Sequence, residues 1–118
     1  MTNNELCALV DHTLLKQTAT WEEIRSLCDE ALAFSTASVC IPPCYVAQAS
    51  DYLGGRMAVC TVIGFPNGNT TAANKLAETR EAIALGADEV DMVINIGMLK
   101  AGRHGEVLNE IRQLKKAA

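Results

Sequence analysis

The 118-residue sequence has few aromatic residues, no long run of like charges and no long apolar run. Its net charge is −4, so it lacks the excess of lysine and arginine with which proteins neutralise nucleic-acid phosphates. No stretch approaches the roughly 18 apolar residues of a membrane span, and the N-terminus has neither the basic segment nor the apolar core of a secretion signal. We therefore expect a cytoplasmic protein that binds neither nucleic acid nor a membrane.

The motifs of common metal, redox and nucleotide sites are also missing. The five cysteines are an odd number and lie mostly in apolar stretches, which predicts buried, reduced thiols instead of a disulfide framework. Cys40 and Cys44 do not have C-x-x-C spacing, and no second cluster has the spacing of metal ligands. The glycine-rich segment 64–68 lacks the lysine of a phosphate-binding loop and fits a turn. The sequence therefore predicts no metal site.

What the sequence does contain is an alternation of short β-branched runs with longer segments of helical period. Hydrophobic residues make up 49% of the chain, which suits helices packed on a buried parallel sheet. This alternation is typical of βα units. Because no repeat, low-complexity tract or linker interrupts it, we predict one α/β domain over residues 1–118, with four parallel βα units after a short N-terminal helix.

Capping and turn signals place the expected elements. Thr20-Trp-Glu-Glu23 is a capping box that begins a helix, Pro42-Pro43 ends a strand, and Gly54-Gly55 ends a helix. The expected strands lie near 10–14 and at 38–41, 57–63 and 90–95; the expected helices lie at 4–9, after the capping box, at 44–53, from Thr70 or Thr71 to Leu85, and over a last segment with Val107, Leu108, Ile111 and Leu114 on its apolar face.

Asp91 is the most unusual residue of the predicted strands. Strand alternation places it on the same face as Val93 and Asn95. In a closed barrel this carboxylate would lie in a largely apolar interior, which is costly unless it is paired or serves a function. Alternatively, Asp91 lies at a strand end and bonds the backbone or a neighbouring threonine. The pattern alone leaves both interpretations open.

Other polar residues near strand ends are weaker candidates. Asp11 and Thr13 alternate with apolar residues on the first predicted strand and could line the mouth of a site. His12 lies between them, and a lone histidine beside a strand is more often structural than catalytic. His104 lies among glycines and is predicted to be in a loop.

Four stretches together resemble deoxyribose-phosphate aldolases. They are Val10-Asp-His-Thr-Leu-Leu-Lys16, Ser38-Val-Cys-Ile41 with Tyr45-Val46, Val62-Ile-Gly-Phe-Pro66 with Gly68, and Gly86-Ala-Asp-Glu-Val-Asp-Met-Val-Ile-Asn95. The resemblance runs from about Leu9 to the end. It implies half of a TIM (β/α)8 barrel from a class I aldolase of deoxyribonucleotide catabolism. Such enzymes reversibly cleave 2-deoxy-D-ribose 5-phosphate to acetaldehyde and D-glyceraldehyde 3-phosphate, without a metal or organic cofactor.

The resemblance also assigns residues. It implies that Asp91 is the proton-relay carboxylate, and the residues it places near the substrate pocket are Asp11, Thr13, Lys16, Cys40 and Phe65. In the family the Schiff-base lysine lies on strand six and a second lysine on strand seven, and neither strand is present in this sequence. The lysines expected to be solvated are Lys75, Lys100, Lys115 and Lys116. Whether this chain is an enzyme therefore stays open.

A half barrel also raises the question of partners. A complete barrel takes about 250 residues, and four strands leave two unpaired edges and an uncovered face. We therefore expect a homo-oligomer, most simply a dimer formed through these edges, and binding of a sugar phosphate only if the barrel is completed. Two hypotheses follow. One is an aldolase-derived chain that is inactive alone; the other is a non-catalytic, self-assembling half barrel that completes a barrel or site in trans.

Overall fold

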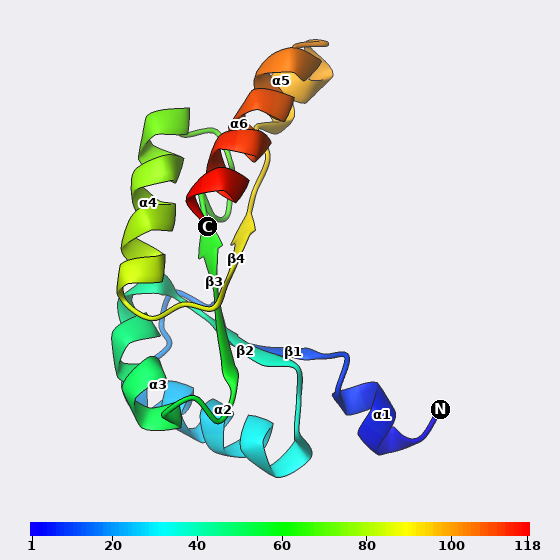
Figure 1. Ribbon diagram of the computed structural model, residues 1–118, viewed down its shortest axis with the longest axis vertical. Helices are drawn as coiled ribbons and strands as arrows, with labels where there is room; N and C mark the ends of the chain where they lie inside the picture. The colour runs from blue at the N-terminus through cyan, green and yellow to red at the C-terminus, as the bar shows by residue number, and fades with distance from the viewer.

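The computed structural model describes residues 1–118 and contains one four-stranded parallel sheet (Figure 1). The strands lie side by side in chain order: β1 (Asp11–Thr13), β2 (Ser38–Ile41), β3 (Ala58–Ile63) and β4 (Glu89–Met92). Each strand is joined to the next by a segment that contains a helix, which is the organisation of successive βα units. The four predicted parallel strands are therefore confirmed, with somewhat shorter bounds at β1, β3 and β4.

The helices are α1 (Asn3–Cys7), α2 (Trp21–Phe34), α3 (Val46–Leu53), α4 (Ala72–Ala84), α5 (Ile96–Lys100) and α6 (His104–Ala117), with a 3-10 turn over Pro43–Tyr45. In Figure 1, α2, α3 and α4 follow one side of the sheet, and α6 packs on α4. α1 stands away from the sheet and buries none of its residues. None of the helices has the length and apolar content needed to cross a membrane.

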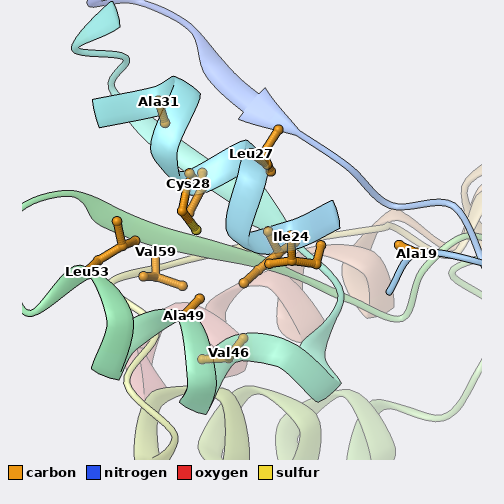
Figure 2. Close-up of a cluster of buried hydrophobic side chains, with 11 residues drawn as sticks. Ala19, Ile24, Leu27, Cys28, Ala31, Val46, Ala49, Leu53 and Val59 are labelled. Carbon is orange, nitrogen blue, oxygen red and sulfur yellow. The ribbon is translucent and has the colours of Figure 1, made fainter. Parts of the chain in front are cut away.

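The start and the buried face of α2 follow the predicted pattern. The Thr20 hydroxyl oxygen accepts a hydrogen bond from the Glu23 backbone N–H at 3.3 Å, which satisfies one of the free donors at the helix start. The buried residues of the helix are Ile24, Leu27, Cys28 and Ala31, at helical spacing. They form a core with the α3 residues Val46, Ala49 and Leu53 (Figure 2).

Strand alternation divides the sheet into two faces. Val39, Ile41 and Val59 point to the helix side and join the main core with α2 and α3. Cys40, Cys60 and Val62 point to the opposite side and form a separate small cluster. We call this second side the open face; it also carries Asp11, Thr13 and Ser38 at the β1–β2 end and Glu89 and Asp91 on β4.

The chain after β4 differs from the prediction. β4 ends at Met92 instead of Asn95, because only the Val93 N–H continues the pairing, to the Ile63 carbonyl. Asn95 caps the unpredicted helix α5, its side-chain oxygen accepting from the Met98 N–H at 3.1 Å. The prediction of a loop at His104 was wrong, since His104 is the first residue of α6. The glycines at 97, 102 and 105 concealed α5 and the start of α6, because glycine is typical of loops.

α6 also presents a different face to the core than its apolar residues predict. Val107, Glu110 and Leu114 are buried, whereas Leu108 and Ile111 are exposed. The reason is a buried partner for Glu110 on α4, which is Lys75. Packing of α6 on α4 therefore follows the ion pair as well as the apolar stripe.

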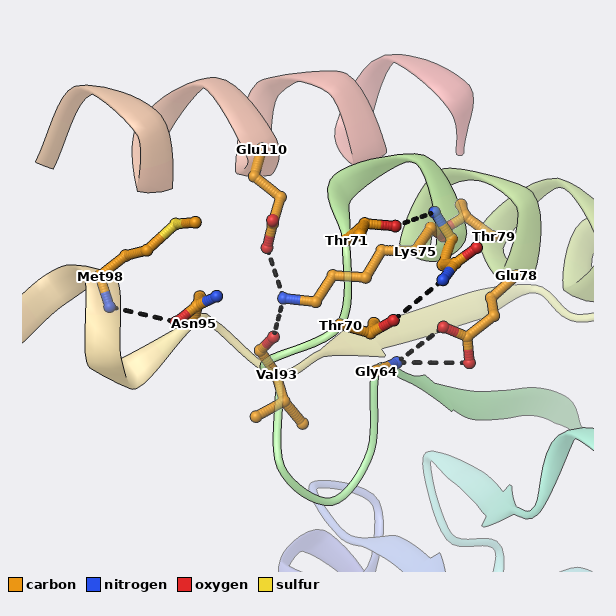
Figure 3. A network of polar contacts seen from close by, with 11 residues as sticks. Gly64, Thr70, Thr71, Lys75, Glu78, Thr79, Val93, Asn95, Met98 and Glu110 are labelled. Atoms are coloured by element: carbon orange, nitrogen blue, oxygen red, sulfur yellow. Dashed lines mark hydrogen bonds and ion pairs between the residues drawn. The ribbon is translucent and has the colours of Figure 1, made fainter. Parts of the chain in front are cut away.

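Lys75 corrects the prediction of a solvated lysine, since its side chain is 0% exposed. Its ammonium group lies 2.5 Å from the Glu110 carboxylate and donates to the Val93 carbonyl oxygen at 2.8 Å (Figure 3). A charged group is buried only at high cost unless it is paired and hydrogen-bonded. Both partners of Lys75 lie far from it in the sequence, so the local pattern of α4 could not reveal the pairing.

Candidate functional site

The candidate site lies on the open face, where residues from all four strands meet. Asp11 accepts a hydrogen bond from the Ser38 hydroxyl at 2.6 Å, across the β1–β2 pair. Thr13, which is opposite Cys40 in the register, donates its hydroxyl to the Asp11 carbonyl at 2.7 Å. Asp11 and Thr13 are exposed.

Asp91 projects from β4 on the same face, opposite Val62 in the register. Its side chain is exposed and takes part in none of the four ion pairs. It also bonds neither the backbone nor a neighbouring threonine, which was the structural alternative to a functional role. The predicted apolar interior would require a closed barrel, and four strands leave this carboxylate in contact with water.

Cys40 and Cys60 lie beside Asp91. The two cysteines face each other as register partners of β2 and β3, and the two sulfur atoms and an Asp91 oxygen all lie within 4.8 Å of one another. Both cysteine residues are buried, at 3% and 1% exposure. Cys44, the cysteine nearest to Cys40 in the sequence, is exposed. The neighbour of Cys40 on the open face is Cys60, which only the strand register could identify.

The two thiols influence each other's protonation. A hydrogen bond with Cys60 lowers the pKa of Cys40, against the opposing effects of burial and of nearby Asp91, Asp11 and Glu89. The same hydrogen bond, together with burial, raises the pKa of Cys60. Losing one proton from the pair is therefore easier than losing two, because the remaining thiol proton stabilises the thiolate.

Lys16 and Phe65 lie further from this cluster, in the segments that follow β1 and β3. The Lys16 ammonium pairs with the Glu23 carboxylate of α2 at 2.9 Å, and this interaction lowers the pKa of Glu23. Phe65 is exposed and borders a hollow of about 590 Å³ beside the start of α4. The hollow is lined mainly by polar and glycine residues of segment 64–70 and of α4. Lys16 thus contacts α2, and Phe65 lies at the edge of the site.

The loops after β3 and β4 are held together beneath the site. Lys75 bonds the Val93 carbonyl just after β4, and its methylene chain lies against Gly64, just after β3. Gly68 approaches the Ile94 backbone so closely that a Cβ there would collide with the Ile94 carbonyl oxygen. In parallel β/α proteins these carboxyl-end loops carry the ligand-binding groups. Lys75 and Gly68 therefore fix the geometry of the region around the site without facing it.

Consecutive parallel strands, helices along one face and polar side chains on the other define half of a parallel β/α barrel. The DeoC/LacD family aldolase model matches residues 6–118. The chain is 56% identical over 108 residues to a deoxyribose-phosphate aldolase of Clostridioides difficile. This match covers 92% of this chain and 49% of the relative. A deoxyribose-phosphate aldolase of Streptococcus agalactiae is 53% identical over 113 residues, covering 96% and 51%.

Solved structures show the same relationship. A chain from Coccidioides immitis superimposes with a TM-score of 0.95 at 37% identity, covering 100% of this chain and 47% of that one. The deoxyribose phosphate aldolase of Aeropyrum pernix gives a TM-score of 0.86 at 28% identity, covering 98% and 50%. The chain therefore belongs to the DeoC/LacD family of aldolases, and it spans about half the length of the curated relatives it matches.

Proposed function

We propose that this chain supplies one half of a deoxyribose-phosphate aldolase barrel, with Asp91 as the proton-relay carboxylate, and does not cleave 2-deoxy-D-ribose 5-phosphate by itself. The observation that carries the proposal is the open face: Asp91 lies there without a partner, and no lysine lies on any of the four strands. The odd number of free thiols suits a reducing compartment such as the cytoplasm.

The chemistry of a class I aldolase explains why a lysine matters. A neutral lysine amine attacks the substrate carbonyl, and loss of water gives a Schiff base. The cationic nitrogen withdraws electrons, so that the adjacent carbon–carbon bond can break while a carboxylate moves the protons. A carboxylate such as Asp91 can perform only the proton transfer. The amine that forms the Schiff base has to come from a lysine that faces this carboxylate.

None of the five lysines of the chain meets this requirement. Lys16 pairs with Glu23 on α2, and Lys75 is buried against Glu110. The other three lie on α5 and α6: Lys100, Lys115 and Lys116. Because no amine faces Asp91, the nucleophile of the proposed reaction would come from the other half of a completed barrel. Asp11, Thr13, Lys16, Cys40 and Phe65 would then contribute to the substrate pocket.

The outer edge of β4 is where the other half would join. Val90, Met92, Ile111 and Leu114 line an apolar groove of about 400 Å³ between this edge and α6. Unpaired strand edges and apolar grooves favour pairing with another chain or segment. Addition of a further parallel strand here would extend the sheet in the direction that barrel closure needs.

Borohydride reduction in the presence of 2-deoxy-D-ribose 5-phosphate tests the proposal, with the adduct detected by intact mass. We expect no adduct on this chain alone, and an adduct on any of its lysines would refute the predicted inactivity. Adding a fragment with the second half of the Clostridioides difficile relative should restore cleavage.

The restored activity then tests the role of Asp91. Asp91→Asn should abolish cleavage, because an amide cannot accept the proton. Asp51→Asn, an exposed position on α3, is the matched control and should leave activity intact. Equal activity of the two variants would remove Asp91 from the mechanism.

A second candidate function is a non-catalytic module that assembles with itself through the sheet edges. Leu9 and Val10, just before β1, and Ile111, beside β4, are exposed apolar side chains near the two edges of the sheet. Their burial in a homodimer would remove apolar surface from water. Light scattering at micromolar concentration should show a dimer, and a folded monomer would contradict this candidate. If the chain binds the second-half fragment tightly but cleavage is not restored, the non-catalytic module is favoured over the aldolase half barrel.

A further inference from the structure

The open face concentrates acidic groups and thiols without a compensating cation. Asp11, Glu89 and Asp91 all act on the Cys40 thiol as negative charges. None of these three carboxylates takes part in an ion pair, and the ion pairs that exist lie elsewhere, at His12, Lys16, Lys75 and Arg103. A site of this charge with two sulfur atoms at its centre attracts a cation that prefers thiolate ligands.

The strand register provides the geometry for such a ligand set. Cys40 on β2 and Cys60 on β3 are register partners, so their sulfur atoms lie side by side, and Asp91 approaches them from β4. The three donor atoms lie within 4.8 Å of one another. Around a tetrahedral zinc ion, with Zn–S near 2.3 Å and Zn–O near 2.1 Å, ligand atoms are about 3.6–3.8 Å apart. Small side-chain rotations would close the difference, and the exposed Asp91 carboxylate is free to make one.

We propose that Cys40, Cys60 and Asp91 form a binding site for a thiophilic divalent cation such as Zn²⁺ or Cd²⁺, with a water molecule in the fourth position. On binding, each thiol loses its proton to the solvent and becomes a thiolate ligand. The two thiolates and the carboxylate carry three negative charges against two positive charges of the ion. Asp11 and Glu89 add further negative potential around the site, and none of the four strands carries a lysine or an arginine.

The surroundings of the cluster support this ligand set over an inert pair of buried cysteines. The two thiols are register partners on neighbouring strands, and an oxygen of the exposed Asp91 carboxylate lies within 4.8 Å of both sulfur atoms. In contrast, Cys28 lies in the main apolar core, where burial raises its pKa to about 11. Cys28 therefore represents the inert type of cysteine within the same chain. The ligand set shares Asp91 and Cys40 with the proposed aldolase site, but cation binding by this chain alone is measured separately from restored cleavage.

Titration of the reduced full chain with Cd²⁺ tests the site, because cadmium thiolates absorb in the ultraviolet. We expect one Cd²⁺ per chain, a thiolate-to-cadmium band, displacement by Zn²⁺ and release of about two protons per ion at a pH where both thiols start protonated. Cys40→Ser and Cys60→Ser should each lose the two-thiolate band and at least about tenfold in affinity. Asp91→Asn should keep the band and lose at least about tenfold in affinity, since even the outer-shell partners of metal ligands contribute about 10–100-fold.

Cys44→Ser and Cys7→Ser are matched controls, since both cysteines lie outside the cluster, and they should bind like the unmodified chain. Absence of a 1:1 complex would overturn the site, as would unchanged affinity in either cluster serine variant or in Asp91→Asn. Circular dichroism reports whether a serine variant is folded. If a serine variant is unfolded, the affinity of Asp91→Asn and the number of protons released by the unmodified chain test the site instead, because neither measurement alters the buried cysteines.

Discussion

The buried ion pair between Lys75 and Glu110 makes the sharpest prediction about stability. Glu110→Leu removes the carboxylate and leaves the Lys75 ammonium buried, with the Val93 carbonyl as its remaining hydrogen-bond partner. Lys75→Met leaves the Glu110 carboxylate without its partner, and the Glu110 side chain is 8% exposed. The double variant replaces both charges with apolar side chains of similar size.

The structure sets the expected magnitudes. Breaking a fully buried pair by removing one partner costs about 3–5 kcal/mol, because the other charge stays desolvated and unpaired. We expect Glu110→Leu in this range and Lys75→Met somewhat below it, since water can reach Glu110 more easily than Lys75. The double variant should be within about 1–2 kcal/mol of the original protein, because no charge is left buried. The coupling energy between the two positions should therefore be at least about 2 kcal/mol.

Urea unfolding followed by circular dichroism measures these differences as midpoint shifts at constant slope. The exposed pair between Lys16 and Glu23 is the control, and Lys16→Met should change the free energy of unfolding by less than about 1 kcal/mol. A cost of Glu110→Leu no larger than that of Lys16→Met would show that Lys75 is hydrated and would refute the burial argument. Additive effects of Glu110→Leu and Lys75→Met would refute the pairing.

Three further predictions concern the core and a loop. Burial raises the pKa of Cys28 from an ordinary 9.0 to about 11, so the unfolded chain loses this proton at a lower pH than the folded protein. The contribution of Cys28 to the free energy of unfolding should therefore be intact below about pH 9 and fall by about 1.4 kcal/mol per pH unit toward pH 11. An equally steep decline in Cys28→Ala would contradict this. Gly68→Ala should cost at least about 2 kcal/mol more than Gly102→Ala in urea unfolding, since both have positive φ but only Gly68 contacts the Ile94 carbonyl; equal costs would argue against that contact. Ile24→Ala should cost about 2–5 kcal/mol in the same assay, and a smaller loss would mean that the α2 core can collapse around the cavity.

Local patterns in the sequence determined the elements that depend on neighbouring residues. The capping box at Thr20 and the helical spacing after it placed α2, and Pro42-Pro43 ended β2 where the structure ends it. The β-branched runs predicted four strands, and their alternation put Asp91 on one face of β4. These signals depend on interactions between residues close in the sequence, so they can be recognised without knowledge of the fold. The glycines near α5 and at the start of α6 predicted a loop, because glycine is typical of loops, but packing forms helices there.

Only the tertiary structure decided which distant residues meet. Lys75 and Glu110 each belong to a helix with ordinary polar positions, and only the packing of α4 on α6 turns them into a buried pair. Cys60 lies twenty residues from Cys40, and the parallel register of β2 and β3 makes them neighbours. The sequence placed Asp91 on one face of β4, but its exposure follows from a sheet that remains open beyond β4. The strands were encoded locally, whereas the charge and ligand environment of the open face arises from contacts that no local pattern contains.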